Sequence, residues 1–284
     1  MTNQISGLYS RISSGAHFVL YSFEKPRMSL EKSMLIFSSD IDVGSPELGA
    51  INKGLRDNDV NLSLSESQVG RIEEISIPIL VETFDSFDVP ISLAVRGQLT
   101  EVHSKVLDFL LSSKVNHDIG AHGYYHTRFT KITVEEAENE LCKISAGMEK
   151  YGVMPRTFVF PRNCVAHLDL LEKHNYVCYR GYNDLFKDCM YIEKCGQLFN
   201  VHPSICVNQY SSPFFLKKIL DISIVKKLPL HVWFHFFNLG QNEKEVQRTA
   251  RKLFAPVLSY AREKQEQGLL TFETMLSAAQ KMEM

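Results

Sequence analysis

The chain has 284 residues, of which 44% are apolar and 23% charged, a composition typical of a folded protein with a large core. Its 31 basic and 33 acidic side chains give a net charge of −2, and the basic residues are scattered, so we expect no nucleic-acid partner. The sequence contains no apolar run long enough for a transmembrane segment or a secretory signal, which predicts a cytoplasmic protein.

Short apolar runs alternate with longer amphipathic stretches from residue 33 onward, whereas residues 1–32 lack this rhythm and are predicted to form an N-terminal extension. The short runs predict strands at 33–40, 90–97, 116–123, 157–163, 176–181 and 228–235. The longer stretches predict helices at 67–87, 100–113, 133–152, 166–174 and 243–268.

Local signals mark some of the helix boundaries. Thr133 and Glu136 have the spacing of a capping box, and Gly152 is a typical helix-stop residue. Pro256 is expected to kink or divide the last helix. The region 185–227 is interpreted as a long insertion before the last clear strand.

The repeated order of strand, helix and strand predicts parallel βαβ units and therefore an α/β fold. The number of units favours a closed or nearly closed (β/α) barrel, formed by residues 33–284 as a single domain. In such a barrel the catalytic residues lie at the C-terminal ends of the strands. Most of the predicted strands end in a side chain that can take part in chemistry.

His122 and His126 lie four residues apart in HDIGAHGYYHTRF, next to the end of a predicted strand. Two neutral imidazoles at this spacing can converge on one metal ion, although a chain with this many histidines produces some such pairs by chance. Gly120 and Gly123 permit a tight loop that would aim both rings at one point. This context favours metal ligation.

Asp40 and Asp42 lie at the end of the first predicted strand, in SSDIDVG. Carboxylates two residues apart share one face of a strand, and a metal ion would relieve the repulsion between them. A solvated acidic turn explains the same residues equally well. The residue types alone leave both interpretations open.

A second histidine pair, His231 and His235, lies within the last predicted strand, where residues four apart are separated by about 13 Å. These two side chains therefore cannot bind one ion together. His235, at the end of the strand, is a candidate for proton transfer, and His231 is expected to be a core histidine.

The motifs SSDIDVG, DVPISLAVRGQL, HDIGAHGYYHTRF, FVFPRN and LHVWFHFFN follow one another in an order that resembles the polysaccharide deacetylase family. This family is also called carbohydrate esterase family four or the NodB homology domain. The resemblance spans residues 33–276 and is strongest at HDIGAHGYYHTRF. It implies a distorted (β/α) barrel with a divalent metal, generally Zn²⁺, and hydrolysis of an N-acyl group, typically the N-acetyl group of an amino sugar.

Carried over by motif, the resemblance implies that Asp42, His122 and His126 bind the metal and that Asp40 is the catalytic base. The first motif of the family has adjacent aspartates, whereas Ile41 separates them here. The roles of base and ligand could therefore be exchanged between the two aspartates.

His235 corresponds to the catalytic histidine of the last family motif and would donate a proton to the departing amine. Among the other polar residues of the motifs, we expect Tyr125, Arg162 and Asn163 to bind the substrate.

The third motif departs from the family pattern, because Val159 occupies the position of an expected arginine. Arg162 or Arg180 could supply the missing charge, although either could equally be a surface or packing residue. The aspartate that would tune His235 has no clear match, and Asp184 is the nearest candidate.

The predicted function is a metal-dependent deacylase for an amino sugar in a polysaccharide or glycan precursor, linked to a nucleotide or a lipid carrier. One alternative keeps the same site but removes a formyl group or opens a cyclic amide. Another alternative, based on the altered first and third motifs, is a carbohydrate-binding relative that has lost catalysis.

Overall fold

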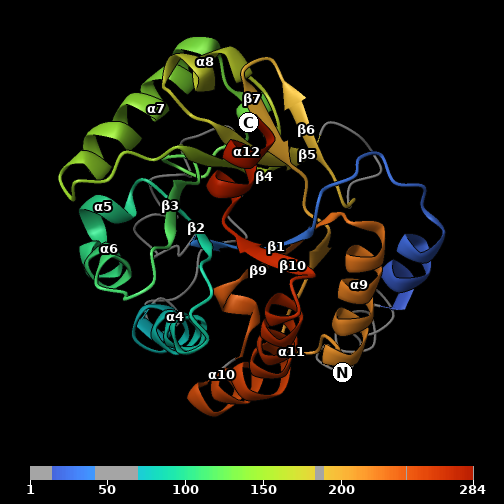
Figure 1. The fold of residues 1–284 in the computed structure, drawn as a ribbon. Coiled ribbons are helices and arrows are strands. Elements are labelled where there is room, and N and C mark those ends of the chain that lie inside the picture. The colour runs from blue at the N-terminus through green and yellow to red at the C-terminus, as the bar shows by residue number, and fades with distance from the viewer. Residues whose placement is uncertain (1–14, 42–69, 183–188, 241, 284) are drawn as a thin grey trace.

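The computed structural model describes residues 15–41, 70–182, 189–240 and 242–283. Ten strands form one curled sheet in the order β6-β7-β5-β4-β3-β2-β1-β9-β8, and β10 pairs with β1 outside this path. The pairing of β6 with β7 is antiparallel and the others are parallel. Helices surround the sheet (Figure 1). The alternating pattern predicts a (β/α) barrel and the family resemblance implies a distorted one, and the fold is of this kind.

The strands are β1 (Ser33–Ile41), β2 (Ser92–Val95), β3 (Asp118–Ala121), β4 (Thr157–Cys164), β5 (Cys178–Tyr182), β6 (Ile192–Cys195), β7 (Leu198–Val201), β8 (Ile205–Cys206), β9 (Pro229–His235) and β10 (Leu270–Glu273). The α-helices are α4 (Ile77–Ser86), α5 (Leu99–Val102), α6 (Ser104–Leu111), α7 (Val134–Glu149), α8 (Leu168–Lys173), α9 (Pro213–Lys226), α10 (Glu243–Thr249), α11 (Ala255–Glu266) and α12 (Met275–Glu283). Every strand predicted from the apolar runs is present, in β1 to β5 and β9.

β1 is the central strand of the barrel, and all nine of its residues are buried. It pairs with β9 along most of its length, with β10 near its start and with β2 near its end. A strand covered on both faces has a continuous apolar run rather than an alternating one, which the sequence of β1 shows until its polar end. The register places Asp40 beside His235 of β9.

The helix boundaries follow the local signals in the sequence. Thr133 Oγ1 accepts a hydrogen bond from the amide of Glu136, and the Glu136 carboxylate accepts one from the amide of Thr133, so the predicted capping box begins α7. Pro256 lies in the first turn of α11, directly after a π-helical turn, Ala250–Phe254, that separates α11 from α10. The expected kink or division thus takes the form of a π-helical irregularity in a helical run that continues from Glu243 to Glu266.

Two expectations from the sequence differ from the structure. The stretch 100–113 is not one helix, because the chain turns at His103 between α5 and α6. The region 185–227 is not an insertion over its described part, 189–227, which supplies both edges of the sheet and α9. Its strands are only two to four residues long, too short for a periodic pattern to identify them.

α12 covers the end of the barrel at which the strands begin, and it overlies the sheet in Figure 1. Met275, Ala278 and Ala279 of this helix pack in one apolar cluster with Met34 of β1 and Phe199 of β7. The core is thus sealed at this end by β10 and α12, neither of which was predicted from the sequence. The opposite end, where the strands finish, is left for the site.

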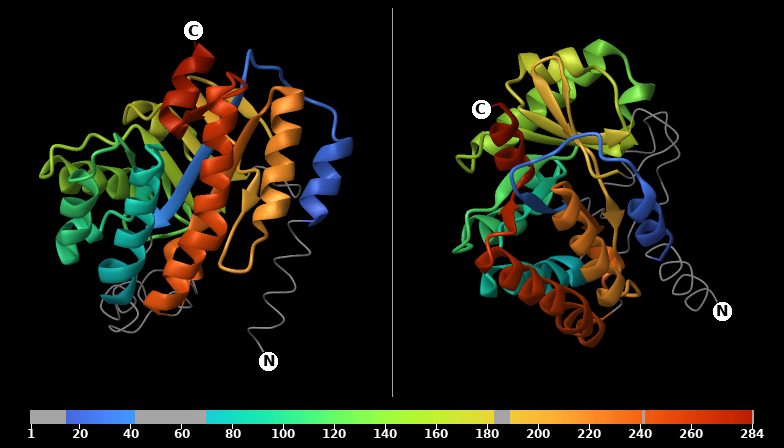
Figure 2. Two further views of the ribbon diagram at one scale, coloured as in Figure 1. Left: turned by 60° about the horizontal axis from the view of Figure 1, so that its bottom comes forward. Right: turned by 45° about the vertical axis from the view of Figure 1, so that its right-hand side comes forward.

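Residues 15–23 are helical and lie beside α9 in both views of Figure 2. Tyr21 is buried and donates a hydrogen bond to the carbonyl of Ser204, while Lys226 donates to the carbonyls of Tyr21 and Glu24, at 2.6 Å each. The described part of the predicted N-terminal extension therefore packs against the barrel. In the described ranges no helix is both long enough and apolar enough to span a membrane.

Candidate active site

A cavity of about 270 Å³ lies where the parallel strands end. Its lining residues come from β1, β4 and β9 and from the segments that follow β3 and β9, and they are Asp40, His122, His126, Arg162, Asn163, Trp233, His235 and Phe237. Residues from four separate segments of the chain meet here because parallel strands carry all their C-terminal ends to one side of the barrel.

Asp40 is buried and held by an arginine from the far side of the barrel. Arg180 Nη2 donates to Oδ1 of Asp40 at 2.6 Å and to Oδ2 at 2.5 Å. Burial by itself would raise the pKa of Asp40, but the positive charge of Arg180, assisted by His122 and His235, lowers it to about 2. Asp40 is therefore ionised at every pH at which the protein would work.

Arg180 lies on β5 and is fully buried. Its guanidinium stacks on the Trp233 ring, with 4.4 Å between the guanidinium carbon and the ring centroid. Of the two arginines that the sequence offered for the third motif, Arg180 is thus the one that contacts Asp40. Arg162 instead lines the cavity itself.

His122 follows β3 directly and is buried. Its Nδ1 lies 2.8 Å from the carbonyl oxygen of Val159, which can only accept, so Nδ1 carries a proton and donates it. Its Nε2 lies 3.8 Å from Oδ2 of Asp40. A backbone carbonyl that fixes one ring nitrogen in this way is a common support for a metal-binding histidine.

His126 meets His122 edge to face, with 4.8 Å between the ring centroids. Burial first, and then the charges of His122 and Arg96, hold the pKa of His126 well below 6.5, so its ring is neutral at pH 7. Its backbone has a φ of 60°, a left-handed conformation that costs energy in a residue other than glycine. The loop therefore turns sharply enough to bring the second ring back to the first.

The loop that joins the two histidines is anchored by α7. The carboxylate of Glu140, which is buried, accepts hydrogen bonds from the amides of Tyr124 at 2.9 Å and Tyr125 at 3.3 Å. Gly123 has a φ of 65°, and a Cβ there would lie 2.9 Å from Pro161, so the predicted need for glycine at this position is explained.

His235 ends β9 and faces Asp40 from the neighbouring strand, with 3.5 Å between Nε2 and Oδ2. Its ring packs against Trp233 and Phe237, at centroid distances of 5.2 and 4.8 Å. This aromatic enclosure leaves the imidazole half-buried at the edge of the cavity. A histidine in that place can exchange a proton with a molecule bound in the cavity.

Arg162 and Asn163 lie at an irregularity in β4, where the register with β5 shifts between Val159 and Cys164. Both have positive φ, 56° and 54°, and both line the cavity as the sequence led us to expect. Such backbone outliers tend to gather at functional sites. Tyr125, by contrast, is not brought to the cavity, because its hydroxyl accepts a hydrogen bond from Lys143 of α7 at 2.7 Å.

The residues that are present fit a divalent metal. Two imidazoles whose rings approach each other, one of them fixed through Nδ1 by a backbone carbonyl, supply nitrogen donors of the kind that Zn²⁺ takes. Asp42, the expected third ligand, and Asp184, the nearest match for the aspartate that would tune His235, both lie outside the described residues.

A second group with metal-ligand chemistry lies apart from the cavity. Glu138 and Cys142 of α7 and His174 at the end of α8 place their ligand atoms within 4.8 Å of one another. Lys173 Nζ donates a hydrogen bond to Oε1 of Glu138 at 2.9 Å, and this is the oxygen that His174 Nε2 also contacts, at 3.0 Å. Cys142 is exposed. The cluster is therefore better described as a surface ion pair between the two helices.

Sequence reasoning missed several residues that support the site, among them Glu140, Trp233 and Phe237. Trp233 could have been found, since it lies two residues before His235 and side chains two apart on a strand share a face. Glu140 carried no comparable signal, because one of many glutamates in an amphipathic helix cannot be told from a solvated one.

No family model matches the chain. Over 151 residues, the sequence is 25% identical to a peptidoglycan deacetylase of Helicobacter pylori (strain ATCC 700392 / 26695), a match that covers 52% of this chain and 49% of that protein. The matched region is thus about half the length of this curated relative.

Several solved structures share the fold. A candidate polysaccharide deacetylase from Mycobacterium smegmatis has a TM-score of 0.65 and 16% identity, over 90% of this chain and 94% of that one. Puue allantoinase has a TM-score of 0.61 and 13% identity, over 92% and 94%. A candidate polysaccharide deacetylase from Pseudomonas aeruginosa PAO1 has a TM-score of 0.61 and 14% identity, over 87% and 90%. The chain thus shares the fold of solved polysaccharide deacetylases, and over about half of its length its sequence is similar to a peptidoglycan deacetylase.

Proposed function

We propose that the chain is a metal-dependent hydrolase that removes an N-acyl group, in the first instance the N-acetyl group, from an amino sugar. The observation that carries the proposal is the arrangement of Asp40 and His235, an ionised carboxylate and a histidine that approach to 3.5 Å at the edge of one cavity. The sequence match to a peptidoglycan deacetylase supports an amino sugar as the substrate class.

His122 and His126 are the proposed metal ligands, with Asp42 as the third. When it is bound, a divalent metal polarises the amide carbonyl and makes the attacking water more acidic. We assign the role of base to Asp40 rather than Asp42, because Arg180 already engages both oxygens of the Asp40 carboxylate. That contact competes with direct coordination of a metal by the same oxygens.

Asp40 accepts the proton of the attacking water while the water oxygen forms its bond to the acyl carbon. The low pKa of about 2, which Arg180 imposes against burial, keeps Asp40 ready to accept but also makes it a weak base. A base this weak can take a proton only from a water that is already acidified. His235 donates a proton to the nitrogen as the carbon–nitrogen bond breaks, which releases a free amine and a carboxylic acid.

Arg162 and Asn163 are proposed to bind the sugar. Asn163 Oδ1 is buried and has no hydrogen-bond partner within the described part of the chain, so it can accept from a hydroxyl of a bound sugar. Arg162 adds a positive charge to the same wall of the cavity.

The experiment that tests the proposal uses protein loaded with Zn²⁺ and follows release of acetate and of free amine by mass spectrometry. The substrates are N-acetylated amino sugars as free oligosaccharides, as nucleotide-linked sugars and as lipid-carrier-linked sugars. We expect acetate release from at least one of these forms, with a rate at least about 100-fold lower in Asp40→Asn.

Allantoin serves as the cyclic-amide substrate in the same experiment. Ring opening of allantoin without acetate release would overturn the amino-sugar assignment in favour of a cyclic-amide hydrolase. Stoichiometric metal binding with no hydrolysis of any substrate would overturn catalysis altogether.

A further inference from the structure

A chain of buried polar groups continues from the Asp40 pair into the centre of the barrel. Arg180 Nη1 lies 2.9 Å from Oγ of Ser38, which lies two residues before Asp40 on β1. Ser38 Oγ lies 2.7 Å from Nε2 of His231, and His231 Nδ1 lies 3.1 Å from the carbonyl oxygen of Val201. Ser38, Arg180 and His231 are each at most 1% exposed.

The chemistry of these groups allows only one direction of donation along this series of hydrogen bonds. A carbonyl oxygen can only accept, so the proton of His231 is on Nδ1 and is donated to Val201. A guanidinium can only donate, so Ser38 accepts from Arg180 and must direct its own proton to Nε2 of His231. A second proton on His231 would leave Ser38 facing two donors, with no acceptor for its own proton.

The orientation of the Arg180 guanidinium depends on its hydrogen bond to Ser38. Its guanidinium has Asp40 and Ser38 as hydrogen-bond acceptors, and its Nε has no hydrogen-bond partner in the described part of the structure. The stacking on Trp233 restrains the plane of the guanidinium but not its rotation within that plane. Ser38 is therefore the contact that fixes the direction from which Arg180 meets Asp40.

The side chain of His231 is not needed to hold its own strand in place. The His231 amide donates to Oγ of Ser204 at 3.0 Å, and the His231 carbonyl accepts from the Ser204 amide at 2.8 Å. β9 also pairs with β1 through backbone hydrogen bonds along this stretch. A neutral imidazole placed here thus has a further effect, which is to accept a hydrogen bond from the Ser38 hydroxyl.

We propose that His231 and Ser38 are positioning residues, which hold Arg180, and through it the Asp40 carboxylate, in the orientation that the reaction needs. The inference rests on the proposed function in so far as Asp40 is the catalytic base. We call the hydrogen bonds from Arg180 through Ser38 to His231 the Ser38 relay; no proton is transferred along it. His231 ends the Ser38 relay with its own proton on Nδ1, and its role is exerted through Ser38 and Arg180.

Two matched pairs of variants separate positioning from a general loss of core structure. His231→Gln places an amide oxygen near the position of Nε2 and can still accept from Ser38, whereas His231→Asn reaches only the position of Nδ1 and can still donate to Val201. Ser38→Ala removes the relay hydroxyl. Ser39→Ala is the control for it. In the wild type the buried hydroxyl of Ser39 donates to the carbonyl of Phe234 at 3.0 Å and not to His231.

We expect Ser38→Ala and His231→Asn to lower kcat by about tenfold, with KM and metal content within about twofold of the wild type. His231→Gln and Ser39→Ala should keep kcat within about twofold. Urea denaturation of all four variants checks that the losses in kcat do not follow the losses in stability. Equal kcat in His231→Asn and His231→Gln, or in Ser38→Ala and Ser39→Ala, would overturn the relay.

A measurement on the wild-type protein tests the proton order without any assay of activity. Nitrogen-15 NMR of histidine-labelled protein should show His231 neutral and protonated on Nδ1 from pH 5.5 to pH 8. A proton on Nε2 would overturn the inference even if the enzyme is active. If no substrate is hydrolysed but the Nδ1 tautomer is found, the proposed function fails while the hydrogen-bond order stands.

Discussion

Arg180 and Asp40 form a buried ion pair in which one guanidinium nitrogen donates to both carboxylate oxygens, at 2.6 and 2.5 Å. The two residues are 140 positions apart in the sequence, and β4, β3 and β2 lie between their strands in the sheet. They meet only because the sheet curls and brings β5 to face β1 across the interior of the barrel.

This pair should be strongly coupled in its effect on stability. Replacing Arg180 by Met leaves Asp40 as an uncompensated buried carboxylate and should lower the free energy of unfolding by about 3–5 kcal/mol. Adding Asp40→Asn to that variant removes the charge and should recover a large part of the loss. Urea denaturation of the two single variants and the double variant measures the coupling, and simple additivity of the two changes would contradict it.

His235 and His126 should differ in what their removal costs. His235→Ala removes the proposed proton donor and should lower kcat by about 10²–10⁴ while metal content stays unchanged. His126→Ala removes a proposed ligand and should lower metal content itself. Kinetics at saturating Zn²⁺, together with elemental analysis of the dialysed proteins, distinguishes the two effects. A His235→Ala variant that works at the full rate would exclude His235 from the reaction.

Glu140 should act on the metal through the loop that it holds. Glu140→Ala leaves the amides of Tyr124 and Tyr125 without their carboxylate acceptor, which should weaken metal binding by about 10–100-fold. The cost in unfolding free energy should be about 1–3 kcal/mol. Zn²⁺ titration and urea denaturation measure the two quantities.

Glu138→Ala is the matched control, since Glu138 lies on the same helix but pairs with Lys173 and His174 at the surface. Its removal should change stability by less than about 1 kcal/mol and should not change metal stoichiometry. A lost equivalent of metal in this control would mean that the cluster of Glu138, Cys142 and His174 binds an ion after all.

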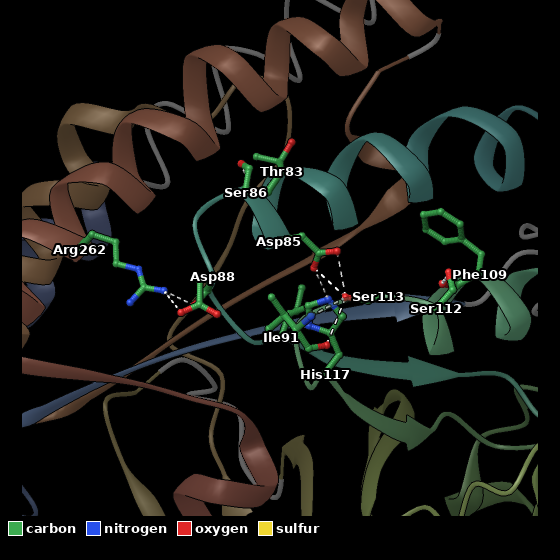
Figure 3. A network of polar contacts seen from close by, with 11 residues as sticks. Thr83, Asp85, Ser86, Asp88, Ile91, Phe109, Ser112, Ser113, His117 and Arg262 are labelled. Atoms are coloured by element: carbon green, nitrogen blue, oxygen red, sulfur yellow. Dashed lines mark hydrogen bonds and ion pairs between the residues drawn. The ribbon is translucent and has the colours of Figure 1, made fainter.

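His117 should make the fold sensitive to acid. Figure 3 shows the Asp85 carboxylate facing both His117 and Ser113. His117 Nε2 lies 3.0 Å from Oδ1 of Asp85, and its Nδ1 accepts a hydrogen bond from the amide of Ile91. Burial lowers the pKa of His117 below 6.5, and Asp85 opposes this only in part. The neutral ring is therefore favoured by folding, and its contribution is complete above pH 6.5 and decreases as the pH falls below that value.

His117→Asn keeps an acceptor for the Ile91 amide but cannot titrate. The unfolding free energy of the wild type should therefore fall relative to that of His117→Asn between pH 7.5 and pH 5. Urea denaturation at several pH values measures this difference. A difference that does not depend on pH would show that His117 is not the group responsible.

Short-range information was sufficient for many features of this protein. The positions of Asp40 and His235 at the ends of strands follow from apolar runs that stop at them, and the start of α7 follows from the spacing of Thr133 and Glu136. The pairing of His122 with His126 is also local, because the two are separated by one tight loop. Each of these features depends on residues close together in the chain, whose preferences a sequence displays directly.

Other features required the whole structure. The strands between 189 and 206 are too short to show a period, and Tyr125 looked like a site residue until the loop was seen to direct it toward Lys143. The sequence by itself determined the barrel class and the ends of the strands that carry Asp40, His122 and His235. Only the tertiary structure decided that Arg180 rather than Arg162 meets Asp40, because that pairing depends on the curl of the sheet, which sums small twists over every strand between β1 and β5.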